Sequence, residues 1–134
     1  MLNITELQSK ITSLAEKYNL SLVVLFGSQA TGKIHPGSDI DIGFIADKQM
    51  GPGDIAGMQL DFEHTMRMGP IECTDLKAVP PLLLKFVAIE GILLYEKTPN
   101  LFAEYKIYFL KLYMEASPLF KMRDEHLARF LSTH

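Results

Sequence analysis

The apolar positions of the chain follow two repeat lengths, one typical of helices and one typical of strands. Near the N-terminus, apolar residues recur at helical spacing at Ile4, Leu7, Ile11, Leu14, Ala15 and Tyr18. This spacing predicts a helix with one apolar face that ends near Asn19, and Asn3 with Glu6 matches a capping box at its start. The branched and apolar run at 21–26 then predicts a buried strand.

The rest of the chain continues this alternation. The pattern predicts strands at 39–46, 71–76 and 92–95, and helices at 54–67 and 82–90. Asp54 is expected to cap the first of these helices, and Pro80 with Pro81 to begin the second. Beyond Asn100 we expect two helices that break near Ser117–Pro118.

The expected order of elements is therefore α-β-β-α-β-α-β, followed by a helical tail. Such an order is typical of an α+β fold, in which a small mixed β-sheet is flanked by helices. We expect a domain over residues 1–99 and a C-terminal helical extension, residues 100–134, packed on it.

Composition argues against several classes of protein. Hydrophobic residues make up 48% of the chain and the formal net charge is −3, so the chain lacks the basic balance of a general nucleic-acid binder. The apolar runs are too short to span a bilayer, and the charged, amphipathic N-terminus does not resemble a signal peptide. Because Cys73 is the only cysteine, no intrachain disulfide can form. We expect a cytoplasmic protein with no membrane or nucleic-acid partner.

Candidate chemistry begins with two aspartates in the second predicted strand. Asp39 and Asp41 share one strand face, because side chains two residues apart point the same way, while Ile40 and Ile42 point toward the core. Two such carboxylates can converge on one divalent ion, or on two ions about 3.5–4 Å apart. The alternative is a solvent-facing strand with two incidental aspartates.

A loop of glycine and small hydroxyl residues precedes this strand. Gly27 directly follows the first predicted strand and would let the backbone approach a phosphate closely. Ser28 adds a hydroxyl, and neighbouring N–H groups can form an anion-binding nest. An ordinary turn is the alternative. Together, loop and carboxylates suit a phosphate ligand with Mg²⁺, which prefers carboxylate, phosphate and water oxygens.

These segments together read G-S-x-A-x-G-x(5)-S-D-x-D-I from Gly27 onward. This motif resembles the signature of the nucleotidyltransferase superfamily that includes DNA polymerase beta. More narrowly, the chain is similar to minimal nucleotidyltransferase (MNT) proteins, from its first helix through the segment PPLLLKFVAIEGILLYE. Members often have arginine where this chain has Thr31, so one contact to phosphate or partner is absent here.

The resemblance implies the roles of individual residues. It implies that Gly27, Ser28 and Ser38 hold the triphosphate of ATP, and that Asp39 and Asp41 bind two Mg²⁺ ions.

The family's third acid is usually an aspartate in a strand, and its position falls on Glu72 of IECTDL. Strand alternation places Asp75 on the other face, so Glu72 is favoured as third metal ligand and catalytic group. The alternative for Asp75 is a cap at the strand end, before Lys77.

The resemblance further implies transfer of AMP from ATP to a hydroxyl group. MNT proteins often pair with a HEPN-domain ribonuclease toxin and act as its antitoxin, some by adenylylating a tyrosine of the toxin. Two alternatives remain: a catalytically weak or inactive antitoxin that neutralises its partner by binding, and a small-molecule nucleotidyltransferase.

The predicted tail is rich in aromatic residues. Its segment LFAEYKIYFLKLY carries Tyr105, Tyr108, Phe109 and Tyr113 over more than one helical stripe. An apolar arc this wide needs two surfaces to bury against, and aromatics are favoured at interfaces. We expect the outward part to contact a protein partner or a second copy of the chain; complete burial within the monomer is the alternative.

Overall fold

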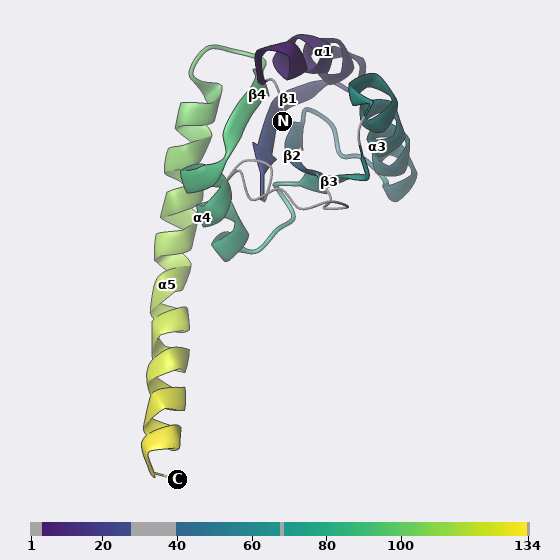
Figure 1. Cartoon of the computed structure of the whole chain (residues 1–134). Helices are drawn as coiled ribbons and strands as arrows, with labels where there is room; N and C mark the ends of the chain where they lie inside the picture. The colour runs from purple at the N-terminus through teal and green to yellow at the C-terminus, as the bar shows by residue number, and fades with distance from the viewer. Residues whose placement is uncertain (1–3, 28–39, 68, 134) are drawn as a thin grey trace.

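The computed structural model describes residues 4–27, 40–67 and 69–133, and its elements follow the predicted order (Figure 1). They are α1 (Ile4–Lys17), β1 (Leu20–Phe26), β2 (Ile40–Ala46), α3 (Pro52–Met66), β3 (Ile71–Asp75), α4 (Pro81–Glu90), β4 (Ile92–Glu96) and α5 (Leu101–Thr133). The boundaries of the first seven elements agree with the sequence prediction to within about two residues, the usual uncertainty of such limits.

The four strands form one sheet in the order β3-β2-β1-β4. β1 pairs antiparallel with both β2 and β4, whereas β2 and β3 run parallel. The expected mixed sheet is thus confirmed. The parallel pair is joined through α3, as a parallel connection requires a crossover segment.

Helices cover both faces of the sheet (Figure 1). On the face that we call the α1 face, α1 and α3 pack against alternate strand residues, among them Leu25, Ile42 and Phe44. On the opposite face, which we call the α4 face, Leu22 and Val24 belong to a second apolar cluster with α4 and the first half of α5. Strand alternation therefore divides the core into two halves.

Side chains of the α1-face helices also reach both edges of the sheet. On α1, Gln8 Nε2 donates a hydrogen bond to the carbonyl of Leu93 in β4, at 2.8 Å. On α3, Gln59 and Glu63 accept hydrogen bonds from backbone N–H groups of β3. Edge strands expose unpaired backbone groups, and here helix side chains occupy some of them.

The start of α3 differs from the prediction. The helix begins at Pro52 with Gly51 as the N-cap, so Asp54 lies inside the first turn and is not the cap. Its Oδ2 instead accepts a hydrogen bond from the N–H of Gly51, at 3.1 Å. Proline is well suited to the first helical position, and an acid in the first turn is favoured by the helix dipole.

The predicted break at Ser117–Pro118 is wrong, because α5 is a single helix of 33 residues. A proline within a helix removes one backbone hydrogen bond and bends the axis, but helix-favouring residues on both sides continue the element. The first half of α5 packs beside α4, and the rest projects away from the sheet (Figure 1).

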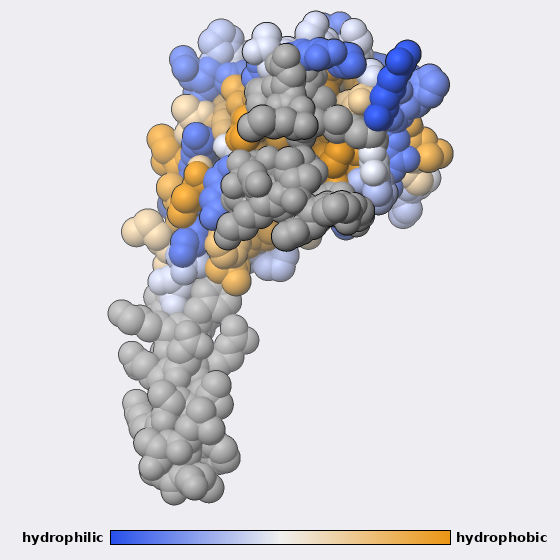
Figure 2. Space-filling view, in the orientation of Figure 1, coloured by the Kyte–Doolittle hydropathy of each residue, from blue (hydrophilic) through white to orange (hydrophobic). Residues whose placement is uncertain are grey.

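The first half of α5 buries only part of its aromatic arc. Phe109 is 2% exposed, whereas its neighbour Tyr108 is 51% exposed, and Tyr105 and Tyr113 lie between these extremes. Apolar surface is visible along this side of the molecule (Figure 2). No helix within the described residues has the length and apolar character needed to cross a membrane.

Candidate active site

Asp41 and Glu72 lie side by side on the α4 face of the sheet. They are direct partners in the parallel ladder between β2 and β3, one step beyond the pair Ile40 and Ile71. Paired residues on neighbouring strands direct their side chains to the same face, and the strands are about 4.8 Å apart. Asp41 is half-buried and Glu72 is exposed, so the edge of the carboxylate pair is open to solvent.

Gly27 closes one side of this acidic pair. It follows Phe26, which is the partner of Asp41 across the β1–β2 ladder. Its φ of +76° lies in the left-handed region, where residues with a side chain are strained. A Cβ at this position would overlap Asp41 Oδ2 and lie 3.3 Å from Asp41 Cγ. The backbone at Gly27 therefore approaches the carboxylate as closely as a glycine allows.

Leu76 fills the space next to the acidic pair on the side away from Gly27. Gly43 is the next residue of β2 on the same face as Asp41, and Leu76 fills the space above it. A Cβ at Gly43 would lie 2.8–3.0 Å from the end of the Leu76 side chain. Leu76 is 2% exposed and packs with the α4-face cluster. The carboxylates are consequently confined to one end of the sheet.

The structure brings together three of the six predicted site residues: Gly27, Asp41 and Glu72. Asp39, Ser28 and Ser38 lie outside the described residues. Within residues 4–27, 40–67 and 69–133, no group of three or more metal-ligating side chains is assembled. The two carboxylates that are described nevertheless provide the hard oxygen donors that Mg²⁺ prefers.

Asp75 is separated from this pair, as strand alternation predicted. Its ladder partner is Phe44, which belongs to the α1-face core. Asp75 Oδ1 accepts a hydrogen bond from the backbone N–H of Lys77, at 2.9 Å. The residue therefore caps the end of β3 and does not share a face with Glu72.

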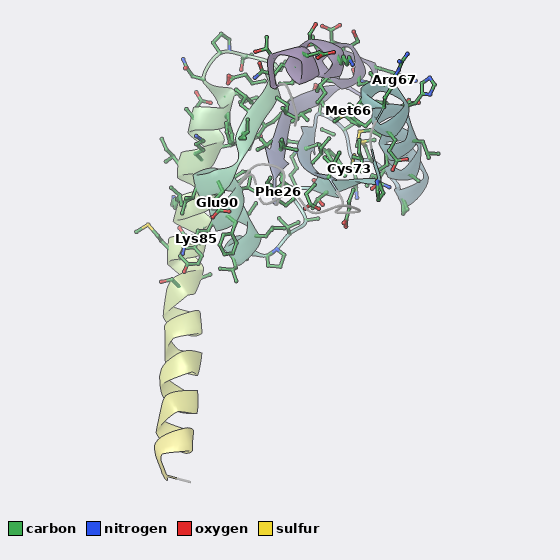
Figure 3. All side chains as sticks on the ribbon, viewed as in Figure 1. Phe26, Met66, Arg67, Cys73, Lys85 and Glu90 are labelled. Carbon is green, nitrogen blue, oxygen red and sulfur yellow. The ribbon has the colours of Figure 1, made fainter. Side chains whose placement is uncertain are left out.

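Cys73 is a buried residue of β3 and lies beside Met66 of α3 (Figure 3). Burial, with a smaller contribution from the nearby carboxylates of Glu63 and Glu72, raises the pKa of its thiol to about 12. A thiol with such a pKa carries almost no thiolate at neutral pH. Cys73 therefore has a packing role and no part in nucleophilic chemistry.

Two residues near the site escaped the sequence analysis. Gln59 and Glu63 of α3 hold the outer edge of β3 through the backbone N–H groups of Cys73 and Ile71. One signal is present in the sequence. Gln59 and Glu63 are polar residues four positions apart, and each directly follows a buried apolar residue of the helix, Met58 and Phe62 respectively. A helix pattern shows such a pair but does not specify which strand it meets.

Comparison with known proteins identifies relatives of this chain. The family model described as polymerase beta, nucleotidyltransferase, matches residues 9–100. The protein adenylyltransferase MntA of Aphanizomenon flos-aquae is 28% identical over 146 aligned positions, which cover 93% of this chain and 97% of that protein.

Solved structures share the fold. A toxin–antitoxin structure with AMP-PNP contains a chain that matches with a TM-score of 0.75 at 21% identity, over 90% of this chain and 98% of that chain. The structure of a tri-AMPylated HEPN toxin of Shewanella oneidensis in complex with an MNT antitoxin contains a chain that matches with a TM-score of 0.72 at 18% identity. The match covers 93% of this chain and 99% of that chain. At these identities the likeness shows the fold alone.

Proposed function

Because the chain belongs to the polymerase beta nucleotidyltransferase family, we propose that it transfers AMP from ATP to a hydroxyl group of a protein partner. The partner that we propose is a HEPN toxin, whose tyrosine accepts the AMP, and the chain thereby acts as an antitoxin. Two relatives support this choice: one is a protein adenylyltransferase, and another is an MNT antitoxin in complex with an AMPylated HEPN toxin.

The observation that carries this proposal is the register between Asp41 and Glu72, with the backbone of Gly27 against the Asp41 carboxylate. Two carboxylates side by side give a metal–phosphate site its acidic ligands. The backbone of Gly27, which carries no side chain, lies directly beside this pair, where we propose that the triphosphate binds. The three residues come from three different strand ends, so folding is required to assemble them.

Asp41 and Glu72, together with Asp39, are the residues that we propose to hold Mg²⁺, with two ions in the complete site. Bound Mg²⁺ would neutralise the phosphate charge and favour release of pyrophosphate. Asp41 is on the central strand β2, which has a neighbouring strand on each side, whereas Glu72 is on the edge strand β3.

The nucleotide would lie against Gly27, with Ser28 and Ser38 as proposed hydrogen-bond donors to its phosphates. In the reaction, the acceptor oxygen attacks the α-phosphorus and the bond to the β-phosphate oxygen breaks, so that pyrophosphate leaves. We assign to Glu72 the acceptance of the hydroxyl proton, a role for a positioned carboxylate. ATP as the nucleotide is supported by the AMP-PNP bound in a structural relative.

The partner would bind along the extension formed by residues 100–134, whose described part exposes Tyr108, Ile107 and Met114. Exposed aromatic and apolar side chains on a helix are suited to helix-mediated protein contacts. We place this activity in the cytoplasm, where ATP is plentiful and where a single reduced thiol such as that of Cys73 is the usual state.

The direct test is co-expression with the product of the neighbouring gene, followed by incubation with ATP and Mg²⁺ and measurement of intact mass. We expect the partner to gain the mass of one or more AMP groups, and the gain to disappear with Asp41→Asn. A stable complex without any gain in mass would contradict transfer and support the binding-only antitoxin. The exposed position of Glu72 on an edge strand is the observation that favours this second function.

A further inference from the structure

Two side chains of α3 bracket Glu72 through its neighbours in β3. Glu63 Oε1 accepts a hydrogen bond from the N–H of Ile71 at 2.8 Å, and Gln59 Oε1 accepts one from the N–H of Cys73 at 2.9 Å. Glu72 lies between these two donors. Because alternate residues of a strand direct their backbone groups to opposite sides, Glu72 directs its own toward β2. The strand around Glu72 is therefore held from both sides.

The spacing of helix and strand explains why two bonds form together. Gln59 and Glu63 are four residues apart, so they share one helix face and are separated along the axis by about 6 Å. Ile71 and Cys73 are two residues apart in β3, a distance of about 6.6 Å. Two side chains about one helical turn apart thus meet the two N–H groups of Ile71 and Cys73, which point outward from the strand.

β3 depends on such support more than the other strands near the site. It has five residues and lies at the edge of the sheet, with β2 as its one neighbouring strand among the described residues. Its ladder is parallel, and parallel pairing is slightly less stable per residue than antiparallel pairing. β2, which carries Asp41, has a neighbouring strand on each side. Of the two carboxylates, Glu72 is the one whose backbone needs fixing from outside the sheet.

Glu63 is itself held in place by packing. A Cβ at Gly69 would lie 3.1 Å from Glu63 Cγ and 3.3 Å from its Cδ, so the Glu63 side chain rests against the glycine backbone. Both hydrogen bonds from α3 to β3 are partly buried. Partial burial shields them from competing water, which makes them stronger than exposed ones.

We propose that Gln59 and Glu63 are positioning residues that fix Glu72 beside Asp41 and thereby set the affinity of the site for its divalent metal. Neither residue touches the metal; each acts through the backbone of β3. The metal-binding part of this inference rests on the proposed function, whereas the anchoring of β3 does not. A displacement of about 1 Å can cost 100-fold in rate, so anchoring of this kind has a measurable effect.

The test uses variants that separate the hydrogen bond from the size of the side chain. Gln59→Met keeps the length but removes the acceptor, whereas Gln59→Glu and Glu63→Gln keep an acceptor oxygen. His64→Ala is the control, because His64 is exposed on the same helix. Two readouts are needed: amide hydrogen exchange at Cys73 by NMR, and binding of Mn²⁺ in the presence of ATP by electron paramagnetic resonance.

We expect Gln59→Met to accelerate exchange at Cys73 while exchange in β1 stays unchanged. The half-saturating Mn²⁺ concentration should rise by about 10-fold or more, the lower end of the usual effect of removing a residue that supports a metal ligand. Glu63→Gln and His64→Ala should remain within about twofold of the unaltered protein, a margin well below that effect. Transfer by Gln59→Met should recover at saturating Mg²⁺, which a general loss of structure would not permit.

Two results would overturn the inference. Unchanged exchange at Cys73 would show that Gln59 does not anchor β3. Faster exchange with unchanged Mn²⁺ affinity would show that β3 is anchored but that Glu72 does not need this support. A lack of Mn²⁺ binding by the unaltered protein with ATP would instead refute the proposed function and the metal role together, and the exchange data would still decide the anchoring.

Discussion

The carboxylate of Asp41 occupies the space that a side chain at position 27 would need. Gly27 also has a φ of +76°, so two independent constraints require glycine at the end of β1. We predict that Gly27→Ala destabilises the fold by about 1–3 kcal/mol, the usual cost of a strained backbone position, and displaces the Asp41 carboxylate. AMP transfer should therefore fall at temperatures where the variant is still folded, as measured by activity assays below its melting point.

Gly57→Ala is the matched control for this substitution. Gly57 lies in the interior of α3, is exposed, and has no atom within 4 Å of an added Cβ. Alanine there should stabilise the protein by about 0.5–1 kcal/mol, because glycine is unfavourable inside helices, and should leave transfer unchanged. Equal stability of the two variants in chemical denaturation would argue against the strain assigned to Gly27.

The second prediction separates the two acids of β3. Glu72→Gln should lower AMP transfer by about 100-fold or more, the lower end of the contribution of a positioned general base. Asp75→Asn should leave the rate nearly unchanged, since Asp75 caps the strand end at Lys77 and faces away from Asp41. Initial rates at saturating ATP and Mg²⁺ measure both. The opposite ranking would show that Asp75 is the third acid of the site.

The third prediction uses two adjacent aromatics of α5 with opposite exposure. Tyr108→Ala should weaken association with the protein partner by about 1–2 kcal/mol or more, as at an interface hot spot, without changing the melting temperature. Phe109→Ala should instead lower the stability by about 3–5 kcal/mol, because its side chain is buried in the α4-face cluster. Titration calorimetry and thermal melts distinguish the two effects.

Sedimentation of the chain, alone and with the product of the neighbouring gene, completes this test. A complex that forms with unaltered affinity when Tyr108 is replaced would place the interface elsewhere. Self-association that is lost with Tyr108→Ala would identify this helix face as a contact between two copies of the chain.

The fourth prediction concerns pH. Asp61 of α3 accepts hydrogen bonds from Lys17 Nζ, at 2.8 Å, and from the Tyr18 hydroxyl. The lysine hydrogen bond, followed by that of the tyrosine, holds the pKa of Asp61 below its ordinary value. The folded chain therefore binds fewer protons than the unfolded chain, and the stabilisation is lost as pH falls through the lowered pKa. The same contact raises the pKa of Lys17, so a second loss follows at strongly alkaline pH.

Thermal melts of Asp61→Asn across pH provide the measurement. The melting temperature should be below that of the unaltered protein near neutral pH, and the difference should shrink below about pH 4, the ordinary range of an aspartate pKa. Glu16→Gln, which removes an exposed carboxylate on α1, is the control for the loss of one negative charge. A difference that stays constant down to about pH 2 would disagree with the pKa assigned to Asp61.

Much of the fold could be predicted because local patterns specify it. Strand alternation correctly placed Asp41 and Ile42 on opposite faces of the sheet, and helical spacing placed Ile11 and Leu14 on the apolar face of the first helix, which is buried in the core. The start of α3 and the continuity of α5 could not be predicted this way. At both points a proline permits two outcomes, and the wider context decides between them: Pro52 begins a helix, whereas Pro118 lies within one.

For the site, the sequence predicted which acids share a face but not what holds them. Strand alternation alone predicted that Glu72 and Asp75 lie on opposite faces of β3. The pairing of Glu72 with Asp41 depends on β3 running parallel to β2 in one particular register, which no local pattern encodes. The contribution of Gln59 depends on a contact between a helix and a strand edge, and such contacts appear only when the topology is known.

The hydrogen bonds that helix side chains make to both outer strands also bear on solubility. Gln8 reaches the outer edge of β4, and Gln59 with Glu63 reaches that of β3. A sheet edge with free backbone groups can recruit a strand from another molecule and so start aggregation. Here an incoming strand would first have to displace a helix side chain at either end of the sheet. Pairing of two copies of the chain edge to edge is therefore disfavoured at these positions.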